Sequence, residues 1–134
     1  MVEFTVNDIP PKEDGANSMW GKPAEIARLK SLRKEAYRAL RGTMPDATRL
    51  TLTLHVHADV AAGDLDNFIT GICDGLQAAH RQTPIDESAW SDVPSELHPR
   101  KPIAFCDDAC IFRILAERHV QLSSGPRYEV QLGW

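Results

Sequence analysis

The strongest constraint on the fold is a stretch of eight residues, 50–57, in which apolar and polar side chains alternate without a break. Strict alternation is typical of a β-strand with one buried and one exposed face. The chain then turns at Gly63, and from residue 65 to about residue 80 apolar side chains recur at helical spacing. A half-buried strand followed by an amphipathic helix predicts an α/β fold in which helices cover a sheet.

The rest of the chain supplies enough elements for one domain over residues 1–134. The further expected elements are a strand at 2–6, a helix at about 24–41, a long surface excursion at about 81–104 with a short helix within 86–92, and strands at 110–121 and 127–132. The strand at 110–121 is apolar on both faces, which predicts a central strand. The turn at 123–126 predicts an antiparallel hairpin with the last strand. Together these elements predict a compact α/β domain, a mixed sheet of about four strands with two main helices.

Two acidic motifs carry the chemistry that we expect. Asp64 and Asp66 follow the strand at 50–57 and open the helix, and Asp107 and Asp108 precede the strand at 110–121. If the motifs meet in space, their carboxylates repel one another, and a divalent cation removes that repulsion. Hard oxygen ligands favour Mg²⁺, with Mn²⁺ possible, over zinc. Such a cation activates water and polarises phosphate esters, so the pattern favours phosphoryl-ester hydrolysis.

Simpler interpretations of these motifs stay open. Either aspartate of the first motif can be the N-cap of the helix, and the second motif can be only a turn. His55 and His57 on the polar face of the strand could hold zinc, but no third ligand at a useful spacing is evident. We find no glycine-rich phosphate loop and no Ser/His/Asp or Cys/His arrangement, so covalent catalysis is not expected.

Several segments together match one known family in their order along the chain and in their residue types. Gly-Asp-Leu-Asp-Asn at 63–67 is followed by a helix with an internal Asp74, and Asp-Asp-Ala-Cys-Ile at 107–111 opens a strand. Ile-Pro-Pro-Lys at 9–12 and Pro-Arg-Tyr-Glu-Val at 126–130 also match. This pattern resembles the RusA-like Holliday junction resolvases over most of the chain, except roughly residues 77–104.

The resemblance implies a magnesium-dependent endonuclease that hydrolyses phosphodiester bonds in branched DNA, such as a four-way junction. A homodimer is implied because such a junction has two-fold symmetry. The implied catalytic residues are Asp64, Asp66 and Asp108; the implied metal ligands are the same three with Asp107; the implied supporting residues are Asn67, Thr70 and Asp74. The expected DNA contacts are Lys12, Lys22, Lys30, Lys34, Arg38 and Lys101.

Two features depart from the family pattern. Thr70 stands where the family has a lysine, a cation that would assist cleavage near the scissile phosphate. The gap between the acidic motifs is also longer than in the family. Lys12, Lys22, Arg81 or Lys101 could supply the cation instead. Two alternatives therefore stay open: a catalytically impaired relative that binds DNA structures or proteins, and a small-molecule phosphoesterase.

The distribution of charge leaves a nucleic-acid partner open. The net charge is −4, yet residues 24–41 hold six basic and two acidic residues. Lys30, Lys34, Arg38 and Arg41 form a stripe opposite the apolar face of that helix, which could neutralise phosphates or could simply be a solvated surface. Three cysteines without C-x-x-C spacing indicate reduced thiols. No apolar run approaches the ~20 residues of a membrane span, so we expect a cytoplasmic protein.

Overall fold

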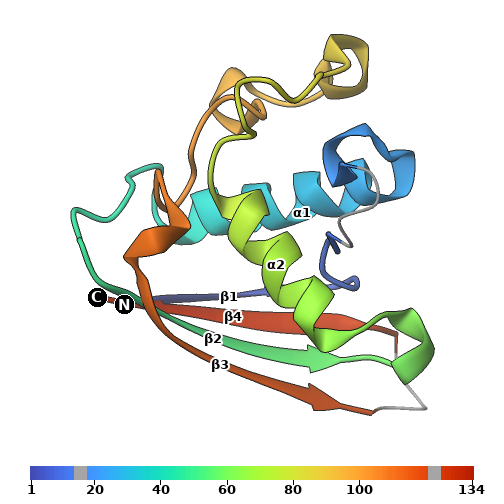
Figure 1. Cartoon of the computed structure of the whole chain (residues 1–134), viewed down its shortest axis with the longest axis vertical. Helices are drawn as coiled ribbons and strands as arrows, with labels where there is room; N and C mark the ends of the chain where they lie inside the picture. The colour runs from blue at the N-terminus through green and yellow to red at the C-terminus, as the bar shows by residue number, and fades with distance from the viewer. Residues whose placement is uncertain (14–17, 121–124) are drawn as a thin grey trace.

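The computed structural model describes residues 1–13, 18–120 and 125–134, and in these residues four strands form one mixed sheet with two α-helices across it (Figure 1). The main elements are β1 (Val2–Val6), α1 (Pro23–Ala39), β2 (Leu50–His57), α2 (Leu65–Leu76), β3 (Ile111–His119) and β4 (Arg127–Gly133). The connections contain the short 3-10 turns η1 (Met19–Gly21), η2 (Val60–Ala62), η3 (Glu87–Trp90), η4 (Ser95–Leu97) and η5 (Asp108–Cys110). The predicted mixed sheet with two main helices is confirmed.

The strand order is β1-β4-β2-β3, so the last strand lies inside the sheet. β4 runs antiparallel to both β1 and β2, whereas β3 runs parallel to β2. The predicted hairpin between the last two strands is therefore wrong, and residues 123 and 124 of its expected turn at 123–126 lie outside the described residues. Alternation within a strand predicts which face is buried, but it does not identify the strand that supplies the hydrogen bonds.

β3 is an edge strand, although its apolar sequence predicts a central one. Phe112, Ile114 and Leu115 are 60%, 44% and 40% exposed. The prediction failed because an apolar run is buried only where other layers cover both of its faces. The guanidinium carbon of Arg49 lies 3.9 Å from the ring centre of Phe112, a cation–π contact that covers part of this surface.

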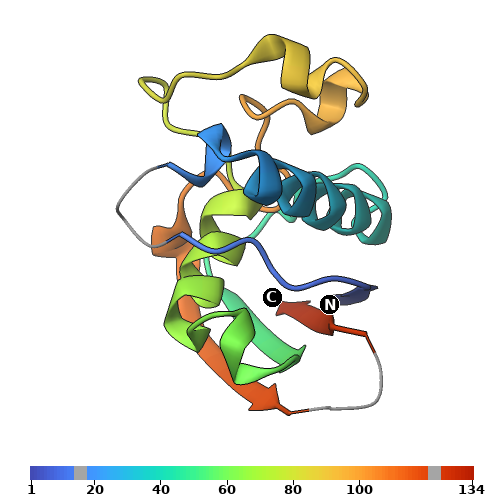
Figure 2. The same cartoon turned by 90° about the vertical axis from the view of Figure 1, so that its right-hand side faces the viewer.

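Both helices pack on the same face of the sheet, as two perpendicular views show (Figures 1 and 2). The apolar half of the strands points toward them. The buried strand residues include Leu50, Leu52, Leu54 and Val56 of β2 and Tyr128, Val130 and Leu132 of β4. These are the predicted inward-facing side chains. The alternate residues, such as His55 and Glu129, therefore lie on the opposite face of the sheet, which we call the open face.

α1 begins at Pro23, one residue before the expected start at about residue 24, because the missing N–H of proline costs nothing in the first turn. It ends at Ala39, and Gly42 adopts a φ of +71° while its N–H donates to the carbonyl of Tyr37 at 2.9 Å. This left-handed glycine is a common helix stop. Among the described residues, no helix combines the length and the apolar character that a bilayer crossing requires.

α2 ends at Leu76, before the predicted residue 80. The carbonyl of Leu76 accepts from the N–H groups of Ile103 and Ala104, at 3.0 and 2.9 Å. The returning chain therefore uses an acceptor that a longer helix would have used itself. These two bonds also fix where the segment that leads into β3 begins.

The segment between α2 and β3 packs on the helices through Trp90, which is 3% exposed. Trp90 is the last residue of η3, the short helix predicted within 86–92. The Trp90 ring lies 5.9 Å from that of Trp20, centre to centre. Lys30 of α1 binds Asp92 at 2.8 Å. The excursion is thus an ordered layer on α1, above the helices in Figure 1.

Arg33 of α1 is the anchor of this layer, and its side chain is fully buried. Its three nitrogens donate to five backbone carbonyls at 2.5 to 3.1 Å. The acceptors are Gly75, Gln77, Leu97, His98 and Lys101. Burial lowers the pKa of Arg33 to about 10, so the group stays charged at neutral pH. One cation therefore joins the end of α2 to the later part of the excursion.

Replacing Arg33 should be far more costly than replacing an exposed arginine of the same helix. Arg33→Ala leaves five carbonyls in the interior without their charged donor, and we expect a loss of about 3 kcal/mol or more in the free energy of unfolding. Arg38→Ala removes only an exposed pair with Glu35, so its expected loss is below about 1 kcal/mol. Urea denaturation measures both; equal losses would contradict this account.

Candidate functional site

The start of α2 presents two exposed carboxylates, those of the N-cap residue Asp64 and of Asp66 in the first turn. Asp64 is the N-cap residue, and its backbone carbonyl accepts from the N–H of Phe68 at 3.2 Å. Its side chain makes no capping hydrogen bond. The simpler interpretation, that this carboxylate is needed as a cap, is therefore not what the structure shows for Asp64.

Two cations hold the backbone of this loop. The Nζ of Lys12 lies 3.4 Å from the carbonyl oxygen of Ala62, and the guanidinium of Arg118 donates to the carbonyl of Gly63. Gly63 has a φ of +151°, and a Cβ there would lie 2.9 Å from the ring of Phe68. Glycine is therefore needed at this position. The acidic loop thus has positive charge beside it even though Thr70 replaces the expected lysine.

Asp66, Thr70 and Asp74 follow one another at intervals of four residues along α2, so they share one side of the helix. Thr70 is exposed, and its hydroxyl donates to the carbonyl of Asp66 at 3.1 Å. The hydroxyl is thus turned back onto its own helix. This side of α2 presents oxygen atoms and no cation of its own.

Asp74 has the clearest electrostatic signature of the predicted residues. Burial, together with the negative charges of Asp108 and Glu13, raises the pKa of Asp74 to about 6. The neighbouring thiol is affected by the same charges. Burial, with contributions from the charges of Asp108 and Asp74, raises the pKa of Cys73 to about 12. The structure therefore brings Asp108 of the second motif to Asp74, two turns along the helix from Asp66.

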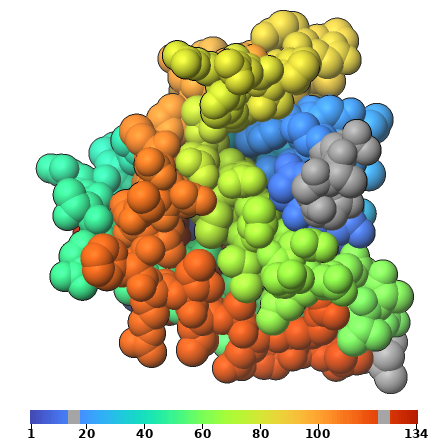
Figure 3. Space-filling view, viewed as in Figure 1, coloured from blue at the N-terminus to red at the C-terminus, as the bar shows by residue number. Residues whose placement is uncertain are grey.

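The parallel pairing of β2 and β3 explains this placement. Leu50, the first residue of β2, pairs with Ile111, the first residue of β3. α2 returns over the sheet from the far end of β2, so its later turns meet the start of β3 (Figure 1). Figure 3 shows α2 between the N-terminal segment and the segment that leads into β3, on one face of the molecule. Asp108 therefore lies nearest the later part of the helix.

Asp107 has a local structural role. Its side chain accepts from the N–H of Ala109 at 2.9 Å and caps the turn η5. This is the simpler, turn-forming interpretation of the second motif. The exposed Asp108 beside it remains available to face α2.

Glu13 is a site residue that the sequence analysis missed. Its N–H donates to the carbonyl of Asn67 at 3.2 Å, which holds the N-terminal segment against α2. A Cβ at Gly71 would lie 1.9 Å from the carbonyl oxygen of Pro11. Only a glycine permits this crossing of backbones. Gly71 inside the helix was the available signal, since an isolated glycine there often marks a close backbone approach.

The predicted DNA contacts fall into two groups. Lys12 lies at the acidic loop, and Lys22 is the N-cap residue of α1. On the basic stripe, Lys30 and Arg38 are paired with Asp92 and Glu35, and Lys34 is exposed. Lys101 and Arg81 lie on the surface of the excursion. The stripe therefore borders the excursion and not the acidic side of α2.

A second group of possible metal ligands lies on the open face. His55, Glu117 and His119 each offer one donor atom, and these atoms lie within 4.8 Å of one another. This group could hold a metal ion. In residues 1–13, 18–120 and 125–134, no trio drawn from the acidic motifs has its donor atoms so close. His55 could be recognised as a possible ligand from the sequence, but Glu117 and His119 could not, because only the pairing of β2 with β3 brings the three together.

Comparison with family models, with curated proteins and with solved structures gives no match.

The raised pKa of Asp74 predicts how the stability of the protein changes with pH when no metal ion is present. A folded-state pKa above the ordinary value of 3.8 means that wild-type stability falls as the pH rises from about 4 to about 6, because the unfolded chain loses its proton first. A pKa of about 6 would correspond to roughly 3 kcal/mol in a dry site. Solvent at this half-buried position reduces the expected effect to about 1 kcal/mol.

Asp74→Asn should therefore stabilise the protein by about 1 kcal/mol at pH 8 in a chelating buffer and remove the decline between pH 4 and 6. Thermal unfolding over pH 4 to 8 measures this. Asp46→Asn, at an exposed loop position, serves as the control and should change little. A lower stability of Asp74→Asn at pH 8 would show that the carboxylate is not under repulsion.

Proposed function

We propose that the protein is a magnesium-dependent endonuclease of the RusA-like kind that hydrolyses phosphodiester bonds in branched DNA. The observation that carries the proposal is that the fold brings the start of β3, which follows Asp108, to α2, which carries Asp66 and Asp74. The raised pKa of Asp74, caused by burial and by the charges of Asp108 and Glu13, supports it. Carboxylates that repel one another at a solvent-accessible surface are typical of a site that a divalent cation completes. The acidic motifs and their match to the family pattern support the same function.

The donor set fits a hard cation. Mg²⁺ is usually held by one or two carboxylates, with water and substrate oxygens completing its shell. A closely packed trio is therefore not required, and carboxylates without a cation should lie apart because they repel. Asp74 and Asp108 would hold Mg²⁺, or Mn²⁺, with Asp66 and Asp64 along the same helix and Asp107 beside them. When bound, the ion would polarise the scissile phosphate and lower the pKa of an attacking water.

The chain's own residues would position the DNA strand. The ammonium of Lys12 lies at the carbonyl of Ala62, and Arg118 binds the carbonyl of Gly63, so both cations border the acidic loop. A phosphate approaching Asp66 would find positive charge there. In this proposal Lys12 takes the part of the family lysine that Thr70 replaces, and Asn67 supports the loop through its backbone bond to Glu13.

The assembly and the compartment belong to the same proposal. A homodimer would present two acidic sites to the two-fold symmetric arms of a four-way junction. The basic residues Lys22, Lys34 and Lys101 would contact phosphates of the arms. The free thiols of Cys73, Cys106 and Cys110 are in keeping with a cytoplasmic protein that acts on DNA.

Cleavage of synthetic four-way junctions tests the proposal. We expect cutting in Mg²⁺ and none in EDTA. Asp66→Asn and Asp108→Asn should each lower the rate by at least about 10–100-fold, because Asp108 is a proposed ligand and Asp66 is an oxygen donor on the same side of α2. Asp46→Asn and His55→Gln are matched controls away from this site and should cut normally. Equal cleavage by wild type and Asp108→Asn would reject the assignment.

One observation favours a second function, a catalytically impaired module that binds branched DNA without cutting it. The Thr70 hydroxyl bonds its own helix backbone, and α2 itself carries no cation between Asp66 and Asp74. Junction binding in Mg²⁺ without cleavage would support this second function.

Thr70→Lys separates the two functions. A lysine here would reach back along the helix toward Asp66 and supply the cation that the family pattern has. If wild type cuts, we expect this variant to cut faster; if wild type only binds, we expect it to gain cleavage. Thr70→Gln, with a neutral side chain of similar reach, is the control. The same rate for the Lys and Gln variants would show that this position does not serve the site.

A further inference from the structure

We propose that His55, Glu117 and His119 form a second metal site, which binds a transition-metal ion of the zinc class on the open face of the sheet. This site does not depend on the proposed nuclease function. It lies across the sheet from α2, and its ligands are chemically different from the carboxylates there.

The register of two strands assembles the site. β2 pairs with β3 in parallel, with His55 opposite Glu117 and His57 opposite His119. Paired residues in a sheet point to the same face, and so do residues two apart on one strand. Four side chains that can bind a metal are therefore gathered on the open face. The two histidines of β2 lie more than fifty residues before Glu117 and His119 of β3 in the chain.

The distances between the donor atoms suit one ion. The Nδ1 of His55 lies 3.0 Å from the Nε2 of His119, and these nitrogens lie 3.8 and 3.6 Å from Oε2 of Glu117. Zinc bonds of about 2.0–2.2 Å in a tetrahedral shell place neighbouring ligand atoms roughly 3.3–3.6 Å apart. The three donors thus already approximate one face of such a tetrahedron, and small rotamer changes would complete it.

The donor types select the class of ion. Two imidazole nitrogens and one carboxylate oxygen suit zinc and its neighbours, whereas magnesium prefers a shell of oxygen alone. Three protein ligands leave a fourth position for water or another ligand, as in open zinc sites. The acidic side of α2 and the open face would therefore bind different ions.

His57 provides a second, independent observation. Its ring stacks on that of His119, with centres 4.7 Å apart and planes 18° from parallel, which restrains the His119 ring. Oε1 of Glu129 lies 2.9 Å from Nε2 of His57, but not in hydrogen-bonding geometry, so both ring nitrogens are buried without a hydrogen-bond partner in the described structure. A buried polar group of this kind is costly. A hydrated ion beside it would supply a partner.

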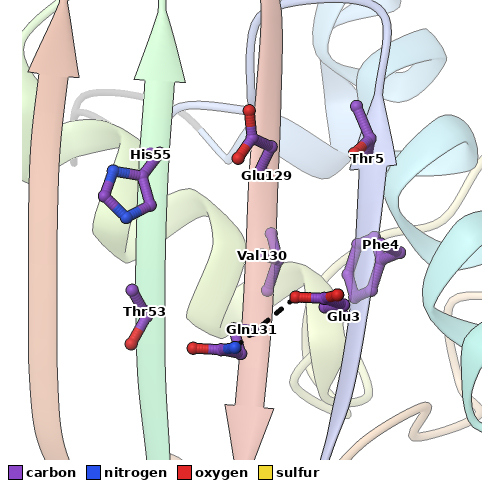
Figure 4. Close-up of a pocket in the computed structure, with 8 residues that line it drawn as sticks. All are labelled: Glu3, Phe4, Thr5, Thr53, His55, Glu129, Val130 and Gln131. Carbon is purple, nitrogen blue, oxygen red and sulfur yellow. Dashed lines mark hydrogen bonds between the residues drawn. The ribbon is translucent and has the colours of Figure 1, made fainter.

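The site is reachable from solvent. A trough of about 530 Å³ runs along the open face, and His55 forms part of its wall. Figure 4 shows the His55 ring leaning from β2 toward β3, beside Thr53 and across from Glu129. Glu117 is itself exposed. An ion bound here would join the edge strand β3 to β2 through side chains as well as backbone hydrogen bonds.

Zinc titration of the whole chain, stripped of metal with a chelator, tests the proposal. We expect calorimetry to show one tight Zn²⁺ site that Mg²⁺ does not compete for, a higher melting temperature with Zn²⁺, and the visible absorption of tetrahedral cobalt when Co²⁺ is added. His55→Gln and His119→Gln should weaken Zn²⁺ binding by at least about 10–100-fold. Glu117→Gln changes an exposed side chain, so it should fold normally and weaken binding about tenfold or more.

Two control variants test whether Zn²⁺ binds at this site and not elsewhere. His80→Gln changes an exposed histidine elsewhere and should bind Zn²⁺ as wild type does. Asp108→Asn should also keep Zn²⁺ binding, so failure of the nuclease proposal would leave this result unaffected. The proposal is overturned if wild type binds no Zn²⁺, or if Glu117→Gln and the two histidine variants bind it as tightly as wild type.

Discussion

The buried guanidinium of Arg33 is the interaction on which the rest of the structure depends. It binds the carbonyls at the end of α2 and those of the excursion at the same time. By fixing both, it sets the place where the chain returns and donates to the carbonyl of Leu76. The segment that follows then carries Asp108 to the side of α2, where its charge contributes to the raised pKa of Asp74. A structural cation thus determines the position of a carboxylate in the candidate site.

The two faces of the sheet offer different chemistry for the same topological reason. Because β3 is parallel to β2, its start lies under the later turns of α2, and its register brings Glu117 and His119 to His55 on the open face. The first consequence is a cluster of hard oxygen donors. The second is a mixed nitrogen and oxygen set that suits a zinc-class ion. Neither set depends on the other, so each can be removed separately.

The elements could be predicted from the sequence because their patterns are local. The alternation of 50–57 and the helical spacing after Gly63 predict β2 and α2, and Pro23 predicts the start of α1. The strand partners could not be predicted, since hydrogen-bond pairing depends on distant residues. For the same reason the position of Glu13 could not be predicted. Glu13 reaches α2 only because Gly71 lets two backbones cross. Asp64 and Asp66 were placed correctly at the start of the helix.

The most direct test of the central claim, that the acidic side of α2 binds a divalent cation, is a crystal structure with Mn²⁺ and its anomalous signal. The account predicts an anomalous peak within coordination distance of carboxylate oxygens of Asp74 or Asp108, and its loss in Asp108→Asn. A well-ordered structure at high Mn²⁺ with no peak there, whether or not the histidine group on the open face is occupied, would contradict it.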